Sequence, residues 1–132
     1  MRIAKIFLVI GLCMAMAVGI GLAADAKKMK AGFIYVGPVG DYGWSHAHDV
    51  GRKFAMEKLP WLETVTVESV GEADSARVID RLVQSEKVDV VFTTSFGYME
   101  DTVKAGPKYP DKYFMHCSGF KNAKNVGTYF GD

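Results

Sequence analysis

The sequence predicts an α/β fold in which helices cover both faces of a doubly wound parallel sheet. Three observations predict it. The 132 residues, 49% hydrophobic and 23% charged, have the composition of one globular domain. Short β-branched or aromatic runs alternate with helical patterns, which implies right-handed crossovers between parallel strands. Two of the runs, 88–92 and 113–117, read as mainly apolar runs and not as alternations, as expected for strands covered on both faces.

Five strands are predicted where β-branched or aromatic residues stand between turn residues. In chain order the ranges are 31–37, 64–70, 88–94, 112–118 and 125–130. In such a sheet a ligand binds outside the carboxyl ends of the strands, where the strand order reverses. The loops that follow the strands are therefore the first place to look for a site.

Three helices are predicted between these strands. The first ends at Pro60, and its inward face is expected to carry Ala47, Val50, Phe54, Ala55 and Leu59. The second follows Asp74, a residue type favoured at the N-cap, with Ala76, Ile79, Leu82 and Val83 inward. The third covers about 98–105 and is ended by Gly106 and Pro107.

The N-terminal segment 1–24 is predicted to be a secretory signal peptide. It begins with Arg2 and Lys5, is uncharged over 6–24 and closes on small residues. The rival interpretation is a membrane anchor, which needs about 20 apolar residues. Three glycines in the run weaken that helix, so we expect cleavage and export to the periplasm.

Neither cysteine is expected to be modified or catalytic. Cys13 follows the large Leu12, whereas lipid attachment requires a small residue there, so a lipid anchor is not expected. Without the leader, Cys117 is the only cysteine, which excludes an internal disulfide. We expect Cys117 to be a buried strand-end residue.

The net charge of +1 falls to −1 without Arg2 and Lys5, which argues against nucleic acid as a partner.

Three of the loops after strands combine aromatic side chains with small polar ones. Each alone is consistent with ordinary turn chemistry. All three at one edge of the sheet favour a wall of a small-molecule site, with flat rings for a flat ligand and polar groups at its edge. The candidate ligand-binding residues are Asp41, Tyr42, Trp44, Ser45, Ser95, Phe96, Ser118 and Phe120.

Other chemistries fit the sequence poorly. The glycines at 37, 40 and 43 lack the spacing of a dinucleotide fingerprint, and Asp41 would repel phosphate. His46 and His48 are two residues apart, so on a helix they point to different sides and do not form a metal pair. His116 and Cys117 are neighbours on a strand and point to opposite faces, which rules out a catalytic pair. No cofactor or metal is expected.

From about residue 30 to 132 the chain resembles the N-terminal part of the basic membrane protein family, the substrate-binding proteins of ATP-binding-cassette importers. The segments that carry the resemblance are KAGFIYVGPVGDYGWSHAHDVGRK, VFTTSFGYM, KYPDKYFMHCSGFK and NVGTYFGD. The resemblance implies a type I periplasmic-binding-protein fold, of which this range is the first lobe, without the second. It also implies a membrane permease as partner.

Members of this family bind purine nucleobases or nucleosides, and this chain is similar to the adenine-type binders. The resemblance implies that Trp44 stacks on the base and that Asp41 and Tyr42 flank it, while Ser95, Phe96 and Ser118 line the neighbouring wall. Many relatives have Phe at the position of Trp44. The alternative is a nucleoside hydrolase of similar fold using Asp41 and His46, but one acid and one histidine are few groups for that chemistry. A response-regulator-like domain is excluded because segment 93–95 lacks an acceptor Asp.

Overall fold

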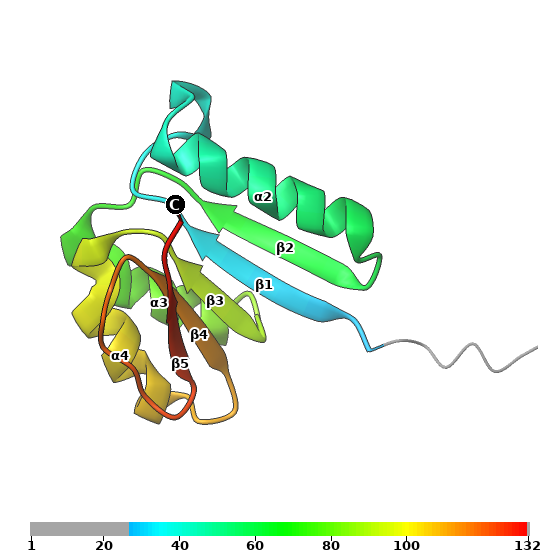
Figure 1. Cartoon of the computed structure of the whole chain (residues 1–132). Coiled ribbons are helices and arrows are strands. Elements are labelled where there is room, and N and C mark those ends of the chain that lie inside the picture. The colour runs from blue at the N-terminus through cyan, green and yellow to red at the C-terminus, as the bar shows by residue number, and fades with distance from the viewer. Residues whose placement is uncertain (1–26, 132) are drawn as a thin grey trace, which may run out of the picture.

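The structure is a computed structural model that describes residues 27–131. One parallel sheet forms its centre (Figure 1). The strands are β1 (Met29–Ile34), β2 (Leu62–Val67), β3 (Val90–Thr93), β4 (Tyr113–Cys117) and β5 (Val126–Tyr129), in the order β2-β1-β3-β4-β5. The order reverses between β1 and β3, as the predicted doubly wound topology requires. The predicted leader 1–24 lies outside the described residues.

The helices lie on both sides of the sheet, α2 on one and α3 and α4 on the other (Figure 1). They are α2 (Trp44–Lys58), α3 (Ser75–Gln84) and α4 (Met99–Lys108), and each is preceded by a 3-10 turn. These turns are η1 (Val39–Asp41), η2 (Glu72–Asp74) and η3 (Phe96–Tyr98). In the part of the chain that the structure describes, no helix combines the length and the apolar character needed to cross a membrane.

The hydrophobic core lies between the sheet and the pair α3 and α4. Alternate strand residues enter it, among them Ile34 from β1, Val91 from β3 and Phe114 from β4, all with 0% exposure. Leu82 of α3 completes this layer and is also fully buried. The prediction for α3 is confirmed at Ile79, Leu82 and Val83, but Ala76 is exposed.

The predicted inward face of the first helix is only partly right, since Ala55 and Leu59 are half-buried but the other three residues are exposed. Val50 and Phe54 of α2 are 51% and 60% exposed, and Ala47 is exposed as well. The buried positions are Ser45 and Asp49. Asp49 is compatible with burial because Arg52 Nη2 lies 2.7 Å from its carboxylate and Arg52 in turn donates to the hydroxyl of Thr64 on β2. An ion pair within α2 and a hydrogen bond from Arg52 to β2 thus stand where a hydrophobic stripe was expected.

The prediction that helices cover both faces of the sheet is confirmed, but the α2 side is covered incompletely. On the face of the sheet turned toward α2, Phe33, Phe92 and Met115 form a row across β1, β3 and β4 and are only half-buried. The helix α2 contacts β2, whereas the β3–β5 half of this face borders an open groove. A mainly apolar strand can therefore have one face that the described residues leave open.

Two helix ends differ slightly from the sequence expectation. Asp74 precedes α3 as predicted, but its carboxylate binds Arg77 and makes no capping bond to the backbone. Helix α4 continues through Gly106 and Pro107 to Lys108. Proline lacks an N–H, so it ends the regular bonding pattern without ending the helical path at once.

Candidate functional site

The loops after the strands gather at one edge of the sheet because all five strands are parallel. We call the loops 35–43, 68–74, 94–98 and 118–122 the carboxyl rim. The sequence-predicted site residues belong to this rim or to the first turn of α2. The rim includes the β1–β3 switch point, where the crevice of a doubly wound sheet opens.

The loop after β1 presents Asp41 and Tyr42 to solvent. Asp41 accepts a hydrogen bond from the backbone N–H of Gly43 at 2.8 Å, which closes the turn before α2. Tyr42 has a left-handed backbone (φ 56°) and is 84% exposed. Among residues 27–131 the Asp41 carboxylate has no cationic partner within salt-bridge distance. A carboxylate oxygen is thus available at the rim.

Trp44 connects the loop after β1 with the loop after β3, across the switch point. Its indole Nε1–H donates to the carbonyl oxygen of Thr94, directly after β3, at 2.5 Å. One side of the indole lies 4.8 Å from the ring of His48, measured between centroids. The side chain remains 44% exposed. The indole is therefore fixed at both ends and still has an open surface.

Ser45 does not reach the surface of the rim. It is 1% exposed, and its hydroxyl accepts a hydrogen bond from the backbone N–H of Gly37 at 3.1 Å. This contact joins the start of α2 to the end of β1. The structure places Ser45 as a support beneath the loop that carries Asp41.

The loop after β3 carries Ser95 and Phe96. The hydroxyl of Ser95 donates to the Glu72 carboxylate at 2.8 Å. Glu72 belongs to the loop after β2, and sequence reasoning missed it. Its position after a predicted strand was the signal that could have found it, but the loop lacks the aromatic residues that marked the other three.

The loop after β4 carries Ser118 and Phe120. The rings of Phe96 and Phe120 lie 6.4 Å apart between centroids and are 56% and 70% exposed. Ser118 is half-buried, has a left-handed backbone (φ 72°) and lies with its hydroxyl 3.7 Å from the Cys117 sulfur. The structure thus brings the predicted residues together in two contacts, Trp44 with the β3 loop and Phe96 with Phe120.

A buried polar chain lies beneath the rim. Thr102 donates to the carbonyl of Tyr98 at 2.7 Å, Thr93 lies 2.9 Å from Thr102, and His116 Nδ1 lies 3.2 Å from Thr93. Because the proton of Thr102 goes to the carbonyl, Thr93 donates to Thr102 and His116 Nδ1–H donates to Thr93. Among the described residues the other ring nitrogen, Nε2, has no partner.

Burial sets the protonation of two groups in this layer. It lowers the pKa of His116, because the charged imidazolium would lose its hydration. It also raises the pKa of Tyr98 to about 12, with a smaller contribution from the Glu72 charge. His116 is fully buried under the backbone of Gly119, where an added Cβ would overlap the imidazole.

The chemistry available at the rim is recognition by rings and hydrogen bonds. Cys117 is buried on the α2 side of β4, and the neighbouring His116 faces α4, as the strand spacing predicted. His46 and His48 each place Nδ1 within 3.0 Å of a backbone carbonyl. Within residues 27–131, His, Cys, Asp and Glu do not gather in threes as a metal site would require.

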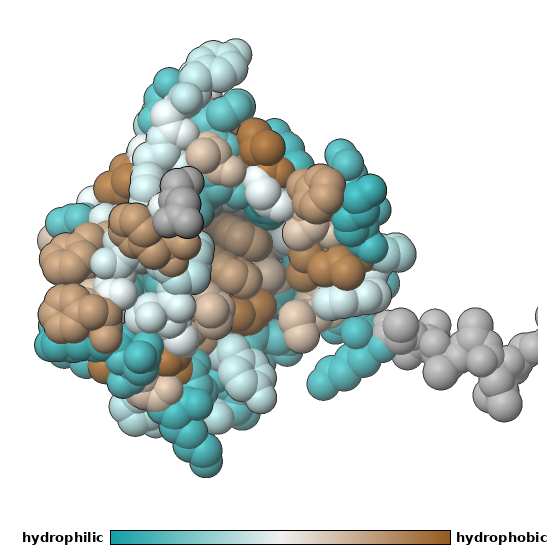
Figure 2. Space-filling view, viewed as in Figure 1, coloured by the Kyte–Doolittle hydropathy of each residue, from teal (hydrophilic) through white to brown (hydrophobic). Residues whose placement is uncertain are grey.

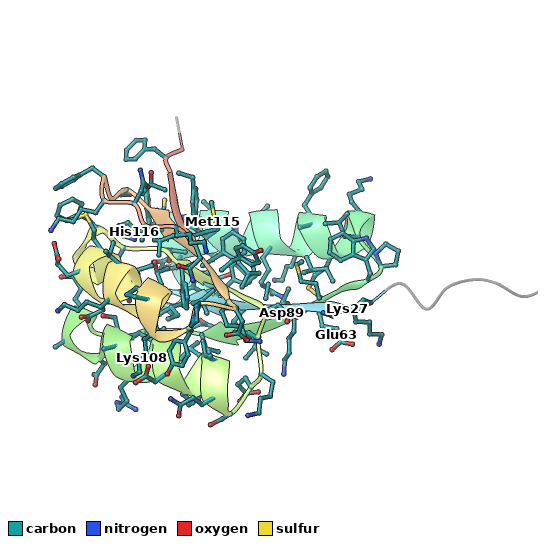
Figure 3. All side chains as sticks on the ribbon, turned by 90° about the horizontal axis from the view of Figure 1, so that it is seen from below. Lys27, Glu63, Asp89, Lys108, Met115 and His116 are labelled. Atoms are coloured by element: carbon teal, nitrogen blue, oxygen red, sulfur yellow. The ribbon has the colours of Figure 1, made fainter. Side chains whose placement is uncertain are left out.

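An apolar groove continues from Trp44 along the α2 side of the sheet. It has a volume of about 580 Å³, and its lining includes Phe33, Phe92, Met115 and Tyr129. Figure 2 shows hydrophobic side chains in the hollow between α2 and β5. Met115 and His116, both labelled in Figure 3, are neighbours on β4. Met115 lines this groove, whereas His116 is buried on the other side of the strand.

This lobe, with its exposed rim at the carboxyl ends of five parallel strands, is the type found in periplasmic-binding-protein-like solute-binding proteins. A crystal structure of an ABC transporter solute-binding protein from Aeropyrum pernix K1 superimposes with a TM-score of 0.68 at 22% identity. The match covers 77% of this chain and 28% of that one. The chain itself belongs to the family described as ABC transporter substrate-binding protein PnrA-like, whose model matches residues 28–132.

Two curated relatives extend this comparison. A purine-binding protein of Brucella abortus (strain 2308) is 46% identical over 111 residues, which are 83% of this chain and 31% of the relative. TsgA13 of Haloferax volcanii, provisionally named an ABC transporter glucose-binding protein, is 38% identical over 111 residues. That match covers 84% of this chain and 28% of the relative. The chain thus spans about a third of the length of either relative.

Proposed function

We propose that the protein is the solute-binding component of an ABC importer and binds a purine nucleobase or nucleoside at the carboxyl rim. The observation that carries the proposal is the Trp44 indole, fixed by Thr94 and open on its surface, beside the cation-free carboxylate of Asp41. A fixed aromatic face is suited to stacking on a base. A carboxylate oxygen is suited to accept from a ring or amino N–H.

The remaining site residues complete this wall. Tyr42 flanks the base, and Phe96 and Phe120 extend the apolar surface over the neighbouring loops. Ser95 and Ser118 supply hydroxyls, while Ser45 supports the first loop from below. A second lobe closes the site from the opposite side.

Export and delivery follow from the same proposal. A signal peptide over 1–24 directs the protein to the periplasm, where the lobe 30–132 binds its ligand and the loaded protein docks on a membrane permease. Binding and release require no bond to be made or broken. The name of the Brucella relative supports the purine class, and the name of the Haloferax relative makes glucose the comparison that a test must include.

Calorimetric titration of the full-length protein with adenine, adenosine, guanosine and glucose tests the proposal. We expect at least one purine to bind and glucose not to bind. Trp44→Ala should weaken purine binding by about 1–3 kcal/mol, the range for an aromatic stacked on a base. Asp41→Asn should cost about 1–3 kcal/mol through the loss of a buried polar partner.

Trp61→Ala is the matched control, because Trp61 is the other tryptophan and lies at the start of β2, away from the rim. Its affinity should equal that of the wild type. Binding of glucose with no binding of any purine would refute the proposal. Wild-type affinity in Trp44→Ala would refute the stacking role.

A further inference from the structure

The end of β3 is bound from both sides by residues of other loops. The Thr94 carbonyl accepts from the Trp44 indole at 2.5 Å, and the adjacent Ser95 hydroxyl donates to Glu72 Oε1 at 2.8 Å. These bonds connect residues 50 and 23 positions apart in the chain. Glu72 therefore binds Ser95, the residue next to Thr94, whose carbonyl oxygen holds the Trp44 indole.

The Glu72 carboxylate packs against the loop after β3. It lies where a Cβ on Gly97 would be, so this position accepts the carboxylate only because residue 97 is glycine. Tyr98, the next residue, is fully buried and donates to the carbonyl of Val70 in the same loop as Glu72. The carboxylate and the phenol together join the loop after β2 to the loop after β3.

The direction of the Ser95 hydrogen bond fixes what this hydroxyl can offer a ligand. A serine hydroxyl has one proton, and an ionised carboxylate only accepts, so the proton of Ser95 is committed to Glu72. The lone pairs of Ser95 Oγ remain for another group. Among the described residues, the second carboxylate oxygen of Glu72 accepts no hydrogen bond, and no cation pairs with it.

We infer that Glu72 is a specificity-determining positioning residue, which holds Ser95 as a hydrogen-bond acceptor and so selects ligands that present an N–H at this point. The inference rests on the proposed purine function. A 6-amino purine such as adenine offers an N–H₂ donor, whereas a 6-oxo purine such as hypoxanthine offers an acceptor at the same position. With its proton donated to Glu72, the Ser95 hydroxyl accepts a hydrogen bond from the 6-amino group and leaves the 6-oxo group without a donor. The negative charge of Glu72 also disfavours phosphorylated ligands.

The test compares adenine and hypoxanthine affinities by calorimetry in the full-length protein. Wild type should prefer adenine by about tenfold or more, since an unpaired polar group costs about one hydrogen bond. In Glu72→Gln the amide N–H can donate to Ser95, which frees the serine proton to point at the ligand. The preference should then fall to about one or reverse. A general loss of stability would weaken both ligands and leave this ratio unchanged.

Three further variants sharpen the test. Gly97→Ala displaces the carboxylate without removing its charge, and Ser95→Ala removes the acceptor, so both should lower the ratio. Glu63→Gln is the charge-matched control, since Glu63 lies at the opposite end of the sheet (Figure 3) and pairs with Lys28. This variant should keep the wild-type ratio. Circular dichroism identifies any variant that fails to fold, and the inference is then decided by the folded ones.

The outcomes separate this inference from the proposed function. A wild type that binds none of adenine, hypoxanthine, adenosine and guanosine overturns both. If the wild type binds purines but the folded Glu72→Gln, Gly97→Ala and Ser95→Ala variants keep its ratio within about twofold, only the role of Glu72 is wrong. A ratio that falls in these variants and not in Glu63→Gln supports it.

Discussion

Acidification should destabilise the protein through His116, and the burial of this side chain determines the sign of the effect and sets its upper limit. The imidazole is fully buried, its Nδ1–H donates to Thr93, and Nε2 has no acceptor nearby among the described residues. A proton on Nε2 would therefore introduce a charged donor with nothing to bind. Burial accordingly lowers the pKa of His116 below its ordinary value of 6.5.

The unfolded chain binds this proton more readily than the folded protein, so stability falls as the pH drops through 6.5. The loss between pH 7.5 and pH 5.5 has an upper limit of about 1.4 kcal/mol, which a histidine that stayed fully neutral in the folded state would reach. The reference variant is His116→Asn, which keeps a donor for Thr93 and does not titrate. The smaller side chain costs about 1–3 kcal/mol at every pH, because it leaves a cavity under Gly119.

Urea unfolding of both proteins at pH 5.5, 6.5 and 7.5 provides the measurement. The difference in unfolding free energy between wild type and His116→Asn should shrink as the pH falls from 7.5 to 5.5, by at most about 1.4 kcal/mol. His46 and His48 are present in both proteins, so their titration cancels. A difference that stays constant over this range would show that His116 is accessible to protons in the folded state, contrary to the argument.

Two remaining predictions concern the cysteines and the leader. Cys117→Ser should leave ligand affinity within a few fold and lower the unfolding free energy by about 1 kcal/mol, since the thiol is buried; loss of binding in a folded variant would contradict this. Mass spectrometry of the exported protein should place the mature N-terminus between Asp25 and Lys28 with no lipid on Cys13. An acylated Cys13, or an intact Met1 in the membrane fraction, would refute cleavage.

The strand pattern could be predicted from the sequence because it depends on local composition. Each predicted strand overlaps an observed one, and their alternation with helices is sufficient to predict a parallel sheet. The inward face of α2 could not be predicted in the same way. Hydrophobic periodicity assigns burial to Val50 and Phe54, whereas Asp49 is buried through an ion pair whose partner, Arg52, also binds β2. The Asp49–Arg52 pair is local, with a spacing of three residues, but the contact of Arg52 with Thr64 depends on the tertiary structure and leaves no periodic signal.

The rim could be predicted from the sequence because parallel strands bring their carboxyl ends to one edge of the sheet, independently of the contacts that their side chains make. The contacts within it were not predictable, since each joins residues that are distant in the chain. Glu72 shows the limit most clearly. Its position after β2 can be predicted from the sequence. Its contact with Ser95, 23 residues later, and the space that the absent Cβ of Gly97 leaves for its carboxylate cannot.

These cross-loop contacts have a consequence for binding. Trp44 is held through Thr94, Ser95 is held by Glu72, and neither contact involves a ligand. A wall fixed in this way has little side-chain entropy left to lose when a ligand arrives, and less binding free energy is spent on ordering it. Phe96 and Phe120 are more exposed, and neither ring is held by a hydrogen bond, so they are the part of the rim best placed to adjust. Specificity should therefore reside around Ser95, and the aromatic pair should add affinity with little discrimination.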